Sequence, residues 1–273
     1  MRNINPPPRN DVEDYQTAIA NRAMPTRTVL EGYIPTITVA YVAYTGTVQD
    51  VVSLMPMTLL SPDHSGLLQS NYDALSPRRI LQELDAELHE AARFRCPMCN
   101  FEQTSTLDHF LPRATYPEFS ILARNLIATC FTCNNSKGSY PANRFVHAYL
   151  DRIPDLPIVV ANATWDPELH LGYSLMRPNG LATDLFARLS DQFELLDLAD
   201  RFKREAGQVL TEIILNCERL FRRGGANLVR AELLRQANDS QFAYGVNHYK
   251  PAMLKALAGD ARFCNGGFRV DVA

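Results

Sequence analysis

The sequence predicts an α+β fold that is predominantly helical, with a small core held by paired cysteines between N-terminal and C-terminal helical regions. Apolar residues recur at helical spacing on both sides of the centre, and the centre carries two close cysteine pairs. The 273 residues, 46% hydrophobic and 21% charged, are typical of a globular protein that buries a substantial core. We expect three regions: 1–92, 93–150 and 151–273.

The N-terminal region begins with a polar, proline-rich segment, 1–10, that lacks the features of a secretory signal. A short helical pattern follows over 11–22. Residues 36–60 are rich in Thr, Val and Tyr, and the pattern there does not separate helix from strand. Because polar residues such as Gln49 and Asp50 interrupt the apolar stretch 34–60, we expect core and no membrane span, in a cytoplasmic protein.

Helical patterns flank the central cysteines. Over 76–93 we expect Ser76 as the N-cap and Pro77 as the first helical residue. The apolar face of that helix comprises Ile80, Leu81, Leu84, Leu88 and Ala91. Beyond the centre, prolines and turn residues predict connecting segments over 153–157 and 163–179. Further helices are expected over 197–223, ended by Gly224 and Gly225, and over 228–237 and 251–257.

Four of the six cysteines form two CxxC pairs: Cys96 with Cys99, and Cys130 with Cys133. Each pair turns back tightly enough to present two thiolates to one ion, and together they complete the four-sulfur set of a structural zinc site. The alternatives are a set of small buried cysteines, or a redox protein in an oxidising setting that the sequence does not suggest.

Polar residues with catalytic chemistry lie between and just after the pairs. Asp108 and His109 open the string DHFLP, Asn125 follows, Asn134 comes directly after the last cysteine of the second pair, and Lys137 follows it. The order CxxC, DHxxP, N, CxxCN, K over 93–145 resembles the HNH endonuclease superfamily, in the variant whose last His is Asn. The resemblance implies a ββα-metal fold stapled by zinc.

The chemistry can also be argued from the residue types. Phosphodiester hydrolysis needs an activated water and stabilisation of the charge that develops on the leaving oxygen. A histidine such as His109 accepts a proton near neutrality. Asp108 supplies a hard oxygen ligand suited to Mg²⁺. If both residues lie on a short strand, their side chains point to opposite faces.

The resemblance implies a role for each member of the set. It assigns His109 as general base, Asp108 and Asn134 as ligands of a catalytic Mg²⁺ or Mn²⁺, Asn125 as the residue whose side-chain carbonyl orients the imidazole, and Lys137 as a phosphate contact. The residue types alone leave a turn or cap open for Asp108, a backbone-bonding loop residue for Asn125 and a helix N-cap for Asn134. The remaining polar candidates are expected to be structural or solvent-facing: Asn135, Ser136, His147 and His248.

The net charge of −3 predicts no partner, but 91–152 carries seven basic against four acidic residues. This patch fits phosphate contacts or an ordinary solvated face. The leading hypothesis is a metal-dependent endonuclease that acts on DNA, with RNA left open. The strings at 107–126, 247–251 and 263–267 resemble bacterial HNH proteins of anti-phage defence systems such as Septu, which implies an ATPase or sensor partner. The alternative is a non-catalytic zinc-knuckle module that binds nucleic acid or acts as an adaptor.

Overall fold

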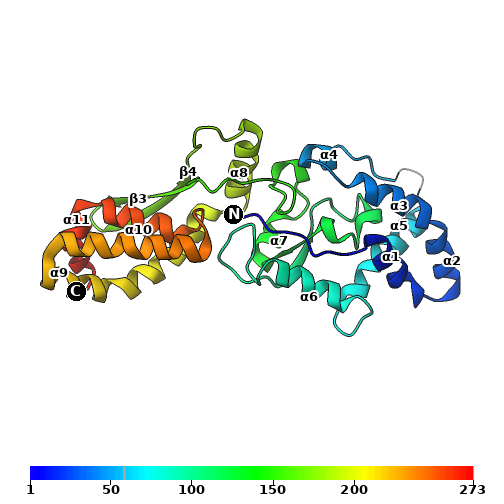
Figure 1. Ribbon diagram of the computed structural model, residues 1–273, viewed down its shortest axis with the longest axis horizontal. Coiled ribbons are helices and arrows are strands. Elements are labelled where there is room, and N and C mark those ends of the chain that lie inside the picture. The colour runs from blue at the N-terminus through cyan, green and yellow to red at the C-terminus, as the bar shows by residue number, and fades with distance from the viewer. Residues whose placement is uncertain (58–59, 273) are drawn as a thin grey trace. The chain divides into compact units, whose positions relative to one another are not determined.

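The computed structural model describes residues 1–57 and 60–272, which form two compact units (Figure 1). Asn3–Arg152 forms the unit that we call the cysteine unit, and Ile153–Ala273 with Met1–Arg2 forms the C-terminal unit. Helices make up 57% of the chain beside two small two-stranded sheets, which confirms the predominantly helical α+β class. Apart from Met1 and Arg2, the expected regions 1–92 and 93–150 thus lie within a single compact unit.

The first half of the cysteine unit is helical throughout its regular elements. Residues 36–60, where the sequence did not separate helix from strand, contain most of α3 (Ile34–Ala43) and all of α4 (Val48–Val52), while 58 and 59 lie outside the described residues. In α3, Ile37, Tyr41 and the adjoining Tyr44 are buried at helical spacing, which is why this Thr- and Val-rich segment winds as a helix. The helices of this half are α1 (Asp11–Ala20), α2 (Met24–Gly32), α3 (Ile34–Ala43), α4 (Val48–Val52), α5 (Pro62–Ser70), η1 (Asn71–Leu75) and α6 (Gln82–Ala91).

The expected helix start at Ser76 is wrong. Ser76 is the C-cap of η1, which ends at Leu75, and α6 begins only at Gln82. Arg78, between them, has a φ of 65°, a left-handed conformation that a right-handed helix does not contain. The apolar face holds from Leu81 onward, but Ile80 is 44% exposed, because it belongs to the loop before α6.

The second half of the cysteine unit is built on two short strands and a helix. β1 (Thr106–His109) pairs antiparallel with β2 (Leu126–Thr129), with Asp108 opposite Ile127, and α7 (Phe131–Lys137) follows β2 at once. Three short 3₁₀ turns surround this ββα arrangement: η2 (Pro117–Phe119), η3 (Ala123–Asn125) and η4 (Ala142–Arg144).

The C-terminal unit corrects the expectation of a connecting segment at 163–179. Residues 163–175 of that segment belong to a hairpin of β3 (Val159–Trp165) and β4 (Leu169–Leu175), because Leu171 and Tyr173 alternate inward on a half-buried sheet. α8 (Thr183–Leu195), which the sequence analysis did not identify, follows the hairpin. The remaining elements are α9 (Leu198–Tyr244), α10 (Tyr249–Gly259), α11 (Ala261–Cys264) and η5 (Gly267–Val272).

The helix pattern at 197–223 and its expected end are confirmed. α9 loses helical dihedrals at Gly224 and Gly225, and Gly225 has a φ of 64°. Downstream, Asn247 and His248 are structural: the Asn247 side chain accepts hydrogen bonds from Ile158 and Val159 at the start of β3, and His248 caps α10. None of the helices in the described part combines the length and apolar character needed to cross a membrane.

Candidate metal and catalytic site

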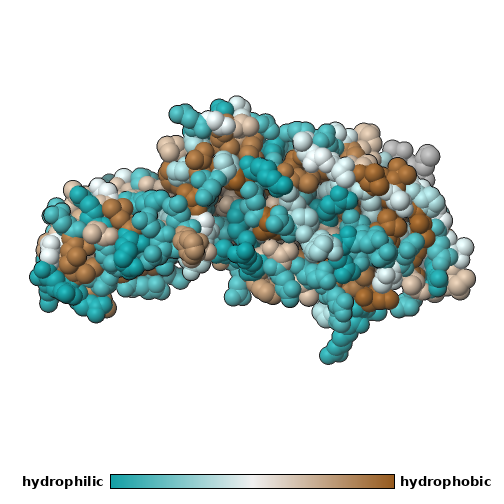
Figure 2. All heavy atoms as spheres, in the orientation of Figure 1, coloured by the Kyte–Doolittle hydropathy of each residue, from teal (hydrophilic) through white to brown (hydrophobic). Residues whose placement is uncertain are grey.

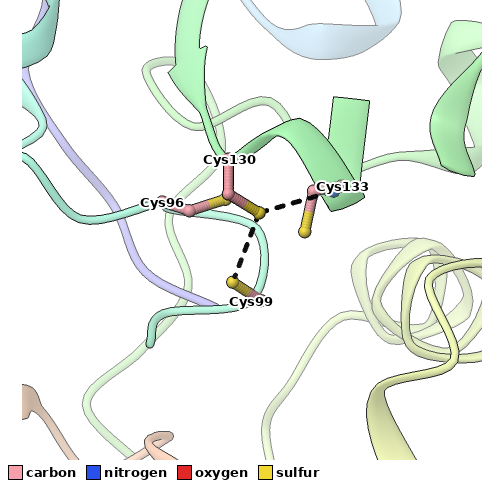
Figure 3. Close-up of side chains that lie close together, drawn as sticks. All are labelled: Cys96, Cys99, Cys130 and Cys133. Atoms are coloured by element: carbon pink, nitrogen blue, oxygen red, sulfur yellow. Dashed lines mark hydrogen bonds between the residues drawn. The ribbon is translucent and has the colours of Figure 1, made fainter. Parts of the chain in front are cut away.

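The four paired cysteines converge on one point (Figure 3). Cys96 and Cys99 lie in the turn after α6, where Asn100 donates its backbone N–H to Cys96 at 2.8 Å and adopts a left-handed φ. Cys130 caps α7, its Sγ accepting the backbone N–H of Cys133 at 3.4 Å. All four sulfur atoms lie within 4.8 Å of one another and all four residues are buried.

This cluster fits a zinc ion. Zn–S bonds of about 2.3 Å at tetrahedral angles place sulfur atoms roughly 3.8 Å apart, and Cys99 and Cys130 are 3.9 Å apart through their Sγ atoms. Hydrogen bonding with the neighbouring sulfurs, that of Cys130 above all, raises the pKa of Cys133. A divalent cation removes that obstacle to deprotonation as it binds, so the set can hold zinc as four thiolates.

Asp108 lies on β1 with its carboxylate directed inward. It is 4% exposed, and its Oδ1 lies 2.9 Å from the Nζ of Lys137 in α7. Its Oδ2 is also buried and has no hydrogen-bond partner among the described residues. A buried carboxylate oxygen without a donor suits a hard cation, so the donor chemistry fits Mg²⁺ or Mn²⁺.

Lys137 does not present its ammonium group to solvent, as a phosphate contact would. The residue is 1% exposed, and its Nζ also donates to the backbone carbonyl of His109 at 2.8 Å. The expected phosphate contact is therefore replaced by a structural one. From its place in α7, Lys137 bonds to β1, the strand that carries Asp108 and His109.

His109 is the last residue of β1 and lies at the edge of the sheet. Its Nε2 is 2.9 Å from the backbone carbonyl of Ser120, and because a carbonyl only accepts, Nε2 carries the proton and Nδ1 the lone pair. Burial lowers the pKa of His109 to about 4, against the opposing effects of the Ser120 carbonyl and the charge of Asp108. The ring packs against Tyr72 at a centroid distance of 4.8 Å.

Asn134 lies inside α7, and the N-cap of that helix is Cys130, so the alternative of a capping role for Asn134 is wrong. Its amide nitrogen donates to Thr106 Oγ1 at 3.1 Å and to the Leu107 carbonyl at 3.4 Å, both on β1. These bonds fix the amide against the strand and leave its carbonyl oxygen as the atom available to a ligand.

Asn125 does not hydrogen-bond to the imidazole of His109, in contrast to its expected role. Its side chain accepts from the Leu111 N–H at 2.8 Å and donates to the carbonyls of Leu111 and Phe119. It holds the chain that follows His109, while the carbonyl of Ser120 makes the bond to the imidazole.

Sequence reasoning missed the role of Tyr44 and His147 behind Asn125. The hydroxyl of Tyr44 donates to Asn125 at 3.0 Å and lies 3.1 Å from Nε2 of His147. Nδ1 of His147 accepts the backbone N–H of Tyr149, so Nε2 carries the proton and donates to Tyr44. His147 is fully buried, and burial lowers its pKa to about 3. The chain of donors runs in one direction, from His147 through Tyr44 to Asn125.

A cavity of about 640 Å³ brings the candidate residues together. Asp108, His109 and Asn134 all line it, from β1 and α7. Further walls come from Tyr72, Asp85 and Arg113, none of which the sequence analysis selected. Arg113 is exposed, and its guanidinium lies over the Tyr72 ring, 5.0 Å from the centroid.

Comparisons with known proteins leave the family open. No protein-family model matches the chain, and no solved structure matches it. The chain is similar to "Protein ea31" of Escherichia phage lambda, with 28% identity over 194 residues. The aligned part covers 63% of this chain and 64% of that protein, so the chain spans less than two thirds of the relative's length.

Proposed function

We propose that the protein is a metal-dependent endonuclease of the HNH type that hydrolyses phosphodiester bonds in DNA. The single observation that carries the proposal is the cavity lined at once by Asp108, His109 and Asn134. The order of β1, β2 and α7 supports the same assignment, with cysteines before β1 and at the start of α7, since it is the arrangement that the resemblance to the superfamily implies.

In the proposed reaction the protein's own side chains have three tasks: they bind the cation, hold β1 in position and accept one proton. Asp108 and Asn134 would hold the divalent cation, which would supply stabilisation of the charge on the phosphate and the leaving oxygen. His109 takes the proton of the attacking water on Nδ1, because Nε2 is committed to the Ser120 carbonyl. Lys137 holds β1 in place through Asp108 Oδ1 and the His109 carbonyl.

Cleavage assays test the proposal. Plasmid DNA, single-stranded DNA and RNA are incubated with Mg²⁺, Mn²⁺ or a chelator, using wild type and His109→Ala. We expect DNA nicking or cleavage that needs the added cation and falls by at least about 100-fold in His109→Ala, the range for loss of a general base. His248→Ala is a matched control, because that histidine lies in the other unit.

Retained cleavage in a folded, zinc-loaded His109→Ala protein would refute the assigned mechanism. Nucleic-acid binding without turnover under every cation would instead favour the non-catalytic zinc-knuckle module. The part in anti-phage defence, with an ATPase or sensor partner, is a separate proposal that rests on the sequence resemblance. Co-purification with proteins encoded beside this one tests it.

A further inference from the structure

A second cavity, of about 350 Å³, lies beside the first in the cysteine unit. The two share one wall, the segment formed by η1 and the loop that follows it. Tyr72, Ser76 and Pro77 of this segment line the first cavity, whereas Asp73, Arg78 and Arg79 line the second. A strand of nucleic acid that leaves the first cavity over this wall therefore meets two arginines.

The linings of the two cavities differ in charge: the first is mainly acidic and the second is mainly basic. In the first cavity two carboxylates, those of Asp85 and Asp108, face one guanidinium, that of Arg113. This excess of negative charge suits a divalent metal. The second contains three arginines against a single carboxylate, that of Asp73. Arg22, the third arginine, bonds to neutral acceptors, the carbonyl and hydroxyl of Ser70, so its charge stays uncompensated.

The two loop arginines are available to a ligand. Arg78 and Arg79 are exposed, and within the described ranges no carboxylate pairs with either guanidinium. The loop projects from the cysteine unit below α6 in Figure 1, and the same projection is hydrophilic in Figure 2. Its shape is held locally: the Arg78 N–H bonds to the Gln82 side chain, and the Arg79 N–H to the Ser76 carbonyl.

We propose that Arg78 and Arg79 form a phosphate-binding loop that holds the DNA backbone outside the cleavage site. Arg113 lines the first cavity with its guanidinium over the Tyr72 ring. In this proposal it contacts the phosphate nearest the cleavage site. Guanidinium groups suit this role, because each offers a planar set of donors to the phosphate oxygens. The inference rests on the proposed function, which it extends from the reacting phosphate to its neighbours.

The test measures binding, so that its result is independent of turnover. Fluorescence anisotropy records the affinity for a labelled DNA duplex, without divalent cation, from about 50 to 200 mM salt, the range in which phosphate contacts are lost. The proteins are wild type, Arg78→Gln/Arg79→Gln, Arg78→Lys/Arg79→Lys and a control that removes two charges from the C-terminal unit, Lys203→Gln/Arg223→Gln. Zinc content and melting temperature establish that each variant is folded.

We expect the Arg78→Gln/Arg79→Gln protein to bind at least about fivefold more weakly and to lower the slope of log K against log salt by about 1.8, two contacts at 0.9 each. The lysine variant should recover most of the slope, because it keeps the charges. An unchanged slope, an equal loss in the control, or tighter binding of an RNA duplex through the same arginines would overturn the proposal. Arginine-dependent binding without cleavage would contradict the nuclease and leave the loop assignment standing.

Discussion

Lys137 and Asp108 form an ion pair that is almost fully shielded from water, with 1% and 4% of their side chains exposed. Burying two charges costs free energy that their attraction only partly returns, and removing one partner leaves the other charge uncompensated. The pair also places a positive charge on the carboxylate whose other oxygen, Oδ2, is buried without a hydrogen-bond partner among the described residues. This ion pair therefore contributes both to the stability of β1 and to the charge of the candidate site.

A double-mutant cycle tests the ion pair. Lys137→Met should lower the free energy of unfolding by about 3–5 kcal/mol, because it leaves the Asp108 carboxylate buried without its ion-pair partner. Asp108→Asn/Lys137→Met should cost less than the sum of the single changes, by about 1–3 kcal/mol. Denaturant unfolding gives these values, with the exposed Lys255→Met as a control expected within about 0.5 kcal/mol. Strict additivity would show that the two groups do not interact.

The buried His147 predicts a pH dependence of stability. Its pKa is about 3 in the folded protein against an ordinary 6.5, so the unfolded chain binds the proton more readily. Stability should therefore fall as the pH drops from about 6.5 towards 3, by about 1.4 kcal/mol per pH unit from this group. Denaturant unfolding gives the free energy of unfolding of wild type and His147→Gln across this range. The difference between the two proteins removes the acid sensitivity of the thiolates, because both contain them. Parallel pH curves for the two proteins would contradict the prediction.

At the scale of elements, the ββα arrangement is too small to be stable alone. β1 and β2 have four residues each and α7 has seven. Short helices and isolated strand pairs are marginal in water, so other contacts must hold them. The cysteine cluster joins the turn after α6 to the first turn of α7, and Lys137 bonds the end of α7 to β1.

Loss of one cysteine should release the metal and destabilise this arrangement. Cys99→Ser should contain less than one zinc per chain and melt about 6–12 °C lower, since a loss of about 3 kcal/mol has that effect at this size. The matched control is Cys217→Ser, a buried cysteine of α9 outside the cluster, whose zinc content should equal that of wild type. Zinc determination and thermal unfolding supply the two measurements. Full zinc content in Cys99→Ser would exclude the four-sulfur site.

At the scale of the whole molecule, each unit has a core of its own. In the cysteine unit Leu84, Leu88 and Phe110 are fully buried, and in the C-terminal unit Phe202 and Met253 are. All the residues of the candidate site lie in the cysteine unit, so the proposed chemistry uses no residue of the C-terminal unit.

Removal of zinc should therefore affect one unit more than the other. After treatment with a strong chelator, hydrogen exchange should rise in β1, β2 and α7, while α9 and α10 keep their protection. Mass spectrometry of the exchanged peptides reports both units in one sample, and added zinc should restore the first set. An equal rise in exchange over both units would contradict this prediction.

The sequence predicts those features that depend on residues close together in the chain. The helical face from Leu81 to Leu88 and the break at Gly224 are of this kind, since spacing and backbone freedom act locally. The start of α6 and the hairpin at Val159–Leu175 were missed, because a loop arginine in a left-handed conformation and a half-buried strand pair depend on what packs against them.

By itself the sequence determined the predominantly helical α+β class, the two cysteine pairs and the order of Asp108, His109, Asn125, Asn134 and Lys137 along the chain. Only the tertiary structure decided what each polar side chain contacts. It buried Lys137 against Asp108, bonded Asn125 to Tyr44, and placed Arg78 and Arg79 with Arg22 in the lining of the second cavity. Spacing constrains neighbours within a few residues, whereas Tyr44 and Asn125 are 81 residues apart and meet only when the core closes.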